Sequence, residues 1–405
     1  MEITQCRVCD GNNLEDVLDL GIQPWGNDFR LIPGQAKKYP LVGCFCNDCS
    51  TFQIKYNVPK EVMYDDHTYL SSANKSMSKH FDSIANKVVD ELNQSAKFVV
   101  DIGSNDGTLL KSYKKRGLRV LGVEPCESAS VKAINDDVPT IIKFFNNETA
   151  DEIKSQHGSA DIISAANVFY HVEELHDIVK GIKTLLSDDG VFIVQGTYLP
   201  NLIKNNEFDI IYHEHLLYYR IENLNFLLNR FGLEVFDVDF ADVHGGSFIA
   251  YISHKSSKSI SKNVTNIIKE ENKLGFNTIK PYKEFSIRVK ELKESVQTML
   301  NDLLSQGKTI YAYGAPVKGT VMMNYCNISS EMIPYAVEVN QEKIGKYIPG
   351  VDVPVIDEND AEEPDYYFLL SWNFLDVFKK SEEYKNGKRK FIVPVPSPYI
   401  SQLDD

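Results

Sequence analysis

Several side chains that can move protons lie close together in the stretch 208–219. His213, Glu214 and His215 directly follow Tyr212, so two imidazoles, a carboxylate and a phenol occupy four consecutive positions. A histidine titrates near neutral pH and can take or give a proton, and a nearby tyrosine or carboxylate can share or direct the transfer. The stretch therefore predicts general acid–base chemistry.

Two other interpretations of this stretch remain open. His213 and His215 could bind a metal ion, although an H-x-H pair has no further ligands nearby. The polar side chains could also be satisfied inside the fold and have no chemical role. His171 follows a predicted buried strand over 161–168 and is a further candidate, because it is expected to point into the crevice where a ligand would bind.

Five of the seven cysteines lie within the first 49 residues. Cys6 and Cys9 form one C-x-x-C pair, and Cys46 and Cys49 form another. Four thiolates complete the tetrahedral coordination of zinc, so the spacing predicts a structural zinc site. Cys44 is a fifth thiol beside the second pair and could replace one ligand. A redox role is less favoured, because neither pair follows a strand of a βαβ unit.

The segment 98–110 predicts a strand, a tight turn and a helix, because a β-branched run breaks at glycine and is followed by a helical pattern. Gly103 and Gly107 in the turn would let the backbone approach a ligand. Glu124 closes the next predicted strand about 20 residues later, where an acid can accept hydrogen bonds from both hydroxyls of a ribose. The unit indicates a nucleotide-like cofactor.

The charge of this turn favours one cofactor. Asp101 precedes the turn and Asp106 lies within it, whereas a dinucleotide site presents bare N–H groups to a pyrophosphate. Two carboxylates suit the ammonium and sulfonium of S-adenosylmethionine. Asn105, in the turn, and Asn167, at the end of a later strand, are expected at the same crevice, because ligands bind at the carboxyl ends of parallel strands. An ordinary turn without a ligand is the alternative.

A second strand, glycine turn and helix are predicted over 309–320. This turn carries Lys318 and no acid, so it suits a phosphate or a pyrophosphate at the helix N-terminus. Further strands of a second α/β sheet are predicted at 335–339, 365–370 and 390–393. The two halves thus differ in charge, and one would accept a cation while the other accepts an anion.

The connecting elements follow from periodicity. A helix is predicted over 80–92, and a long amphipathic helix over 285–303 should pack between domains. Residues 188–190 predict a turn, and residues 254–280 predict a connection with broken helix. A chain of 405 residues exceeds a single core, and we expect an α/β protein of two or three domains.

The overall charge limits the partners. The formal net charge is -14 and the pI is about 5.2, which disfavours nucleic acid and anionic membranes. The N-terminus shows neither the basic nor the apolar region of an export signal, and no apolar span of membrane-crossing length occurs. We expect a cytoplasmic protein that is a monomer or a weak homo-oligomer.

The motifs along nearly the whole chain resemble those of the nucleotide-sugar C-methyltransferases of deoxysugar biosynthesis. They are two C-x-x-C pairs, I-G-S-N-D-G-T-L-L, G-V-E-P, N-V-F-x-H-V, F-D-x-I-Y-H-E-H, H-G-G-S, Y-G-A-P-x-K-G and P-D-Y-x-x-x-L-x-W-N. The resemblance implies a zinc-binding domain (1–70), a class I methyltransferase domain that binds S-adenosylmethionine (71–255) and a C-terminal Rossmann-like domain that positions a nucleotide sugar (256–405). It implies methylation beside the ketone of an NDP-4-keto-deoxyhexose, usually at C3 and in some members at C5.

The resemblance also implies roles for single residues. Tyr212, Glu214 and His215 match the acid–base motif, His171 matches the histidine after N-V-F, and Tyr69 matches a tyrosine on the substrate side. His215 is the expected base, with Tyr212 and His171 as alternatives.

On the substrate side, the expected binding residues are His244, Tyr313 and Lys318. Two departures from the family pattern concern the sugar more than the reaction. Ile249 stands where relatives commonly have arginine, and Gln195 ends a strand where an acid is common. Methylation at oxygen or nitrogen of a nucleotide sugar, and a non-catalytic zinc-bearing binding protein, are the competing functions.

Overall fold

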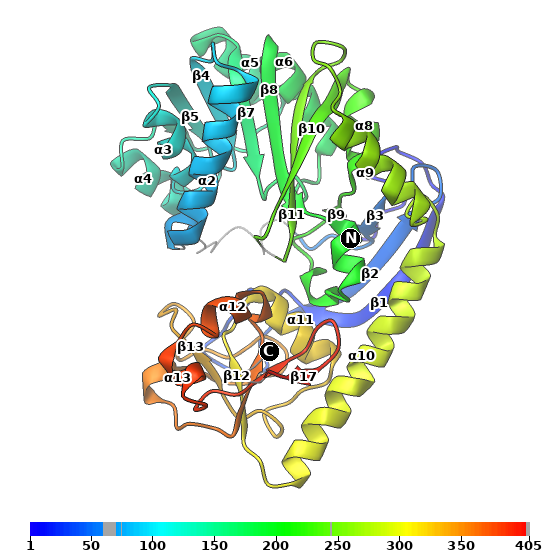
Figure 1. The fold of residues 1–405 in the computed structure, drawn as a ribbon, viewed down its shortest axis with the longest axis vertical. Coiled ribbons are helices and arrows are strands. Elements are labelled where there is room, and N and C mark those ends of the chain that lie inside the picture. The colour runs from blue at the N-terminus through cyan, green and yellow to red at the C-terminus, as the bar shows by residue number, and fades with distance from the viewer. Residues whose placement is uncertain (60–69, 74, 244, 402–405) are drawn as a thin grey trace.

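The computed structural model describes residues 1–59, 70–73, 75–243 and 245–401. These residues form an α/β fold, as expected, with three sheets. Figure 1 shows the two larger sheets in separate α/β lobes, with β1, β2 and the long helix α10 (Lys280–Ser305) along one side of both.

The smallest sheet has the strand order β1–β2–β3–β9, and all its pairs are antiparallel. Its strands are Leu14–Pro24, Lys38–Cys46, Phe52–Ile54 and Leu217–Tyr218. The fourth strand, β9, begins two residues after His215. The cysteine-bearing module therefore shares a sheet with the segment predicted to do acid–base chemistry.

The central sheet has the order β10–β11–β8–β7–β4–β5–β6. Strands β8, β7, β4, β5 and β6 are parallel, and β10 and β11 add an antiparallel edge. The strands are β4 Phe98–Ile102, β5 Arg119–Val123, β6 Thr140–Ile141, β7 Ala160–Ala166, β8 Leu186–Thr197, β10 Leu233–Ala241 and β11 Ser247–His254. Parallel strands such as β4 are buried on both faces, which explains their unbroken apolar runs.

Helices cover both faces of this sheet. They are α2 Lys75–Lys87, α3 Thr108–Lys114, α4 Glu127–Asn135, α5 Asn147–His157, α6 Leu175–Leu185, α8 Ile221–Asn229 and α9 Lys262–Lys273. Helix α7 (Leu199–Lys204) packs instead in one hydrophobic cluster with α10. Short helical turns occur at η1 Ser71–Ala73, η2 Val88–Leu92 and η3 Phe208–Ile210.

The C-terminal sheet has the order β14–β13–β12–β15–β16–β17 and is parallel except for β17. Its strands are β12 Ile310–Tyr313, β13 Ala336–Glu338, β14 Val355–Asp357, β15 Tyr366–Leu369, β16 Phe391–Val393 and β17 Tyr399–Ile400. The accompanying helices are α11 Val317–Tyr325, α12 Leu375–Phe378, α13 Glu382–Lys385, η4 Glu358–Asp360 and η5 Trp372–Phe374. The second α/β unit is thus present as predicted.

Helix α10 connects the lobes through the apolar stripe that the sequence predicts. Phe285, Val289 and Leu292 are buried in one hydrophobic cluster with Leu18 of β1 and Ile310 of β12. Burying such a stripe contributes roughly 1.5–3 kcal/mol per side chain and fixes the N-terminal module against the C-terminal lobe. Within the described residues, no helix combines the length and apolar composition needed to cross a membrane.

The connection 254–280 contains helix, as expected, in one piece over 262–273. Ser261 caps this helix, α9, by accepting a hydrogen bond from the Val264 N–H. The turn expected at 188–190 is wrong. The polar residues 188–190 lie within β8, whose pairing with β7 is interrupted at that point. An insertion of polar residues into one strand is a bulge, which sequence periodicity does not distinguish from a turn.

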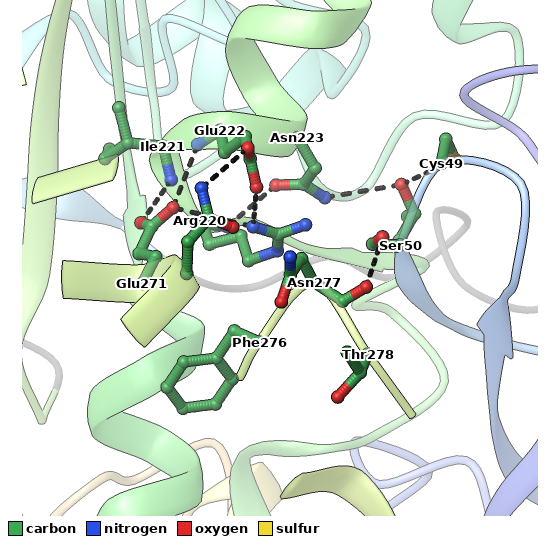
Figure 2. Close-up of polar contacts among 12 residues, drawn as sticks. Cys49, Ser50, Arg220, Ile221, Glu222, Asn223, Glu271, Phe276, Asn277 and Thr278 are labelled. Atoms are coloured by element: carbon green, nitrogen blue, oxygen red, sulfur yellow. Dashed lines mark hydrogen bonds and ion pairs between the residues drawn. The ribbon is translucent and has the colours of Figure 1, made fainter. Parts of the chain in front are cut away.

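Glu271 of α9 joins this helix to the start of α8 (Figure 2). One carboxylate oxygen accepts hydrogen bonds from the Ile221 N–H at 2.7 Å and the Tyr198 hydroxyl at 2.9 Å. The other accepts the Glu222 N–H at 3.1 Å and lies 3.7 Å from the Arg220 guanidinium. The buried carboxylate therefore satisfies N–H groups at the helix start and balances a buried cation.

We expect Glu271→Ala to lower the free energy of unfolding by about 3 kcal/mol, because it removes the buried acceptor of the α8 N–H groups and one of the two acids that pair with Arg220. The neighbouring Glu270 is exposed and forms a surface ion pair with Lys273 at 3.6 Å, so Glu270→Ala is a matched control. Chemical unfolding followed by circular dichroism measures both variants. Equal stability of the two variants would contradict the role assigned to Glu271.

Candidate active site and zinc site

The four cysteines predicted to bind zinc lie together beside the small sheet. The sulfurs of Cys6, Cys9, Cys46 and Cys49 all lie within 4.8 Å of one another. The Cys6–Cys49 and Cys9–Cys46 sulfur distances are 3.6 and 3.5 Å, near the roughly 3.8 Å expected for four thiolates around one tetrahedral zinc. In the part of the chain that is described, no other group of three or more such side chains could hold a metal. The residues therefore fit zinc.

Hydrogen-bond donors support one of these sulfurs. The Val8 N–H and the Gln53 side-chain amide donate to Cys6 Sγ at 3.4 and 3.1 Å. Such donors stabilise a metal-bound thiolate. Cys44 lies outside the group, and burial raises the pKa of its thiol to about 12, so it stays a neutral core thiol. Cys44 therefore does not replace any of the four predicted zinc ligands in this structure.

Arg7 lies between the first two cysteines and connects the zinc site to the acid–base segment. Its guanidinium donates to the Ile54 carbonyl of β3 at 2.7 Å, to the Gln53 side chain at 3.2 Å and to the Leu216 carbonyl at 3.5 Å. Leu216 directly follows His215. A folded zinc site thus fixes the backbone next to the predicted base.

Glu124 lies at the end of β5 as expected. Its two carboxylate oxygens accept the Asn105 N–H at 2.9 Å and the Cys126 N–H at 2.8 Å. Burial raises its pKa, and these two hydrogen bonds oppose the rise. Because each oxygen can accept a second hydrogen bond, the carboxylate can still bind the hydroxyls of a ribose.

The glycines of the turn are required by the packing of the chain itself. Gly103 and Gly107 have φ of 65° and 75°, a conformation that glycine adopts readily. A Cβ on Gly103 would lie 2.5 Å from Val168, and one on Gly107 would lie 3.0 Å from Val138. These glycines therefore also permit the chain to pack on itself, and the close approach of a ligand to this turn stays a prediction.

The two acids of the turn have different environments. Asp101 is buried and accepts a hydrogen bond from the Ser164 hydroxyl at 2.6 Å. Burial raises its pKa to about 7 despite this bond. A cation placed near Asp101 would stabilise its charged form.

Asp106 is fully buried and holds the chain over the turn. It accepts the Ser72 N–H at 3.0 Å and the Thr108 hydroxyl at 2.6 Å, and next to it Asn105 accepts the Ser71 N–H at 2.9 Å. Burial would raise the Asp106 pKa, but these hydrogen bonds and the Lys132 charge lower it. Its carboxylate therefore holds residues 71–72 against the glycine turn.

Two of the predicted bases lie side by side. The ring centroids of His171 and His215 are 5.0 Å apart. Nδ1 of His171 donates to the Glu214 carbonyl at 2.6 Å, and Nδ1 of His215 donates to the Ile210 carbonyl at 3.1 Å. A carbonyl only accepts, so each neutral ring carries its proton on Nδ1 and its lone pair on Nε2. Both imidazoles are thus fixed in a tautomer that can act as a base.

Aromatic rings enclose His215. The Tyr212 ring is tilted by 38° against that of His215, with 3.9 Å between ring centroids, and burial raises the pKa of Tyr212 well above its usual value. Its phenol therefore stays neutral and can donate a hydrogen bond. Tyr170 lies 4.4 Å from His215, and its hydroxyl donates to Asn167 at 3.4 Å, which joins the predicted cofactor residue to the histidine pair. Tyr170 was not predicted, although it occupies the open position of the N-V-F-x-H-V motif.

His213 lies apart from this cluster. Its Nε2 donates to the Pro40 carbonyl at 3.3 Å, and its ring meets Tyr39 edge-on. Burial lowers its pKa to about 4, so it is neutral. Because His213 and His215 point to different neighbours, the H-x-H metal interpretation is not supported in the described structure.

The predicted anion site is less open than its sequence suggests. Lys318 donates to Asn373 at 2.6 Å, and its ammonium lies 3.5 Å from the centroid of the Trp372 ring. Burial lowers the pKa of Lys318 to about 8, and the charges of Asp209 and Glu207 oppose this shift. Both acids are buried beside a lysine that was expected to meet phosphate.

Tyr313 is part of a separate polar group. Its hydroxyl donates to Glu358 at 2.8 Å and accepts from Arg389 at 2.7 Å. The structure therefore gives Tyr313 two side-chain partners within its own lobe.

Glu338 is a candidate that sequence reasoning missed. The Ala315 N–H of the second glycine turn donates to Glu338 at 2.8 Å, just as the Asn105 N–H donates to Glu124 at 2.9 Å. The sequence did contain a signal for Glu338, because this acid ends the first strand after the second glycine turn, as Glu124 does after the first. Two other predicted site residues, Tyr69 and His244, lie outside the described residues.

The fold and the site together define a methyltransferase that depends on S-adenosylmethionine and carries a structural zinc site. Models described as "Putative zinc binding domain", "Methyltransferase domain" and "C-methyltransferase C-terminal domain" match residues 6–64, 74–238 and 242–396.

The chain is 30% identical to the C-methyltransferase NovU of Streptomyces niveus over 98% of this chain and 97% of that protein. This chain belongs to that family of C-methyltransferases.

Other matches cover less of the chain. The ubiquinone biosynthesis O-methyltransferase of Acinetobacter baylyi is 28% identical over 24% of this chain and 42% of that protein. Among solved structures, a Pyrococcus horikoshii protein is 15% identical over 49% of this chain and all of its own, with a TM-score of 0.37.

We expect the affinity for S-adenosylmethionine to rise by up to about tenfold between pH 6 and pH 8, because a cationic ligand favours ionised Asp101 and the ionised fraction grows over this interval. Calorimetric titration measures the dissociation constant. Asp101→Asn should remove the pH dependence, and an equal slope in this variant would assign the effect to another group.

We expect Cys46→Ser to abolish the binding of one zinc ion, because three thiolates leave the shell incomplete. Cys44→Ser lies two residues away on the same strand and should keep the full zinc content. Atomic emission analysis of the purified variants distinguishes them. Loss of zinc from the Cys44 variant alone would overturn the assignment of ligands.

Proposed function

We propose that this C-methyltransferase methylates the carbon beside the ketone of an NDP-4-keto-deoxyhexose, at C3, in branched deoxysugar biosynthesis. The motif resemblance along the chain supports the substrate class. One observation supports the chemistry: His171 and His215 lie 5.0 Å apart with both Nδ1 atoms bonded to backbone carbonyls. Such a pair is suited to removing a proton from carbon.

A proton on carbon beside a ketone is acidic, but its removal at neutral pH needs a positioned base and stabilisation of the enolate oxygen. In our proposal His215 takes the proton through Nε2. Tyr212, which stays neutral, donates a hydrogen bond to the developing oxyanion, and His171 is the alternative base or a relay. Two positioned groups of this kind account for roughly 10²–10⁴-fold each.

S-adenosylmethionine, when bound, supplies an electrophilic methyl group. Asp101, Asn105, Glu124 and Asn167 would hold it, together with the turn that contains Gly103 and Gly107. Asn167 lies within hydrogen-bond distance of Tyr170, which contacts His215. The cofactor crevice and the proposed base are therefore adjacent, and the carbanion needs only close approach to the methyl group.

The C-terminal lobe would position the nucleotide. Glu338 beside the second glycine turn suits a nucleoside, and Lys318 would exchange its neighbours for a diphosphate. Tyr69, His244 and Tyr313 complete the proposed substrate set. We propose domain limits of 1–70, 71–255 and 256–405, with the substrate held between the two larger domains.

We expect the enzyme in D2O to exchange a proton at C3 of the correct sugar without S-adenosylmethionine, and to methylate the same carbon when it is present. NMR of a panel of NDP-4-keto-deoxyhexoses measures both events. His215→Asn should reduce exchange at least 100-fold and leave the affinity for S-adenosylmethionine unchanged.

His157→Asn, at the end of α5, is a control that should keep full exchange. Exchange and methylation at C5 would show that the enzyme methylates C5 and not C3. Methylation at oxygen or nitrogen without exchange would contradict the enolate mechanism. Full exchange by the His215 variant would remove His215 from the role of base.

A further inference from the structure

Both tryptophans of the chain bond to carboxylates of the acid–base segment. Trp25 donates its indole N–H to Glu214 at 2.8 Å, and Trp372 donates to Asp209 at 2.7 Å. Trp25 directly follows β1 of the N-terminal sheet, whereas Trp372 begins η5 of the C-terminal lobe. The segment is therefore held from two sides by separate parts of the molecule.

The position of Trp25 is itself fixed by the C-terminal lobe. Trp25 is 5% exposed and packs against Val58. The next carbonyl, that of Gly26, accepts a hydrogen bond from the Thr320 hydroxyl of α11 at 3.0 Å. A Cβ on Gly26 would lie 2.6 Å from Val317, so only glycine permits this close approach. Glu214 thus lies where all three parts of the chain meet.

The charged and titratable groups that face Glu214 come from several elements. Lys343 donates to the Ala315 carbonyl at 2.7 Å, and its charge acts on the Glu214 carboxylate. The Tyr212 phenol is also coupled to this carboxylate. His171 bonds to the Glu214 backbone carbonyl and not to its side chain. Among the described hydrogen bonds of the carboxylate, the direct donor is the Trp25 indole.

We propose that Trp25 is a positioning residue that fixes the Glu214 carboxylate, in its ionised form, next to the backbone carbonyl that His171 contacts. The N-terminal module then contributes to the reaction through an indole as well as through its strands. The effect of Trp25 on the rate of C–H exchange rests on the proposed function, whereas the hydrogen bond between the indole and the carboxylate does not.

The direction of the effect follows from the environment. Burial raises the pKa of Glu214 to about 6, and the Trp25 hydrogen bond and the Lys343 charge oppose this rise. Removing the indole N–H should therefore raise the pKa further. A smaller fraction of the enzyme would then have ionised Glu214 at a given pH below about 7.

Fluorescence tests the contact without any substrate. Trp372→Phe leaves Trp25 as the only tryptophan, and we expect its emission to change with pH around a midpoint near 6. Adding Glu214→Gln should abolish this change. A pH-independent emission, or one that persists in the Glu214→Gln protein, would overturn the assignment.

Kinetics separate positioning from a general structural role. In Trp25→Phe, the acid limb of the pH profile of C–H exchange should move upward by about one pH unit, which lowers exchange about fivefold at pH 6 and little at pH 8. Trp372→Phe, which removes the matched bond to Asp209, should keep the wild-type midpoint. An equal loss at every pH in Trp25→Phe would contradict the proposal. If the wild-type enzyme exchanges no proton in any sugar, the proposed function fails while the fluorescence result still decides the contact.

Discussion

The placement of segment 208–219 is the constraint on which the rest of the structure depends. This short, irregular stretch carries the proposed base, and it does not contain enough regular secondary structure to fix itself. It is held by pairing of β9 with β3, by Arg7 on the Leu216 carbonyl and by two indole–carboxylate hydrogen bonds. Because these contacts come from the N-terminal module and the C-terminal lobe, three parts of the chain must assemble before the histidine pair is complete.

The zinc module is needed to hold segment 208–219 in place. A module of this size has a small core, and four metal–thiolate bonds stabilise it where apolar burial is insufficient. Its third strand then provides an edge for β9, and α10 ties its first strand to the C-terminal lobe. The zinc ion thus has a structural role and takes no part in the reaction itself. It supports the backbone that carries His215.

Much of this could be predicted from the sequence, because the relevant signals are local. The cysteine pairs, the apolar parallel strands and Glu124 at the end of β5 depend on spacing within a short stretch. The bounds of helix α9 could not be predicted, because few of its residues are apolar and one of its two buried residues is Glu271. The hydrogen bonds of Trp25 to Glu214 and of Trp372 to Asp209 join residues 189 and 163 positions apart, so no local sequence pattern could predict them. Likewise, only the packing around Gly103 shows that Val168 leaves no room for a side chain there.

The most direct measurement is a crystal structure of the enzyme with S-adenosylhomocysteine and an NDP-4-keto-deoxyhexose. We expect the carbon beside the ketone to lie within about 4 Å of Nε2 of His215 or His171 and to face the sulfur of the cofactor product. We also expect the ketone oxygen to lie within hydrogen-bond reach of Tyr212. A sugar whose hydroxyl or amino group faces the sulfur, with both histidines distant from the ring carbons, would contradict C-methylation through an enolate at this site.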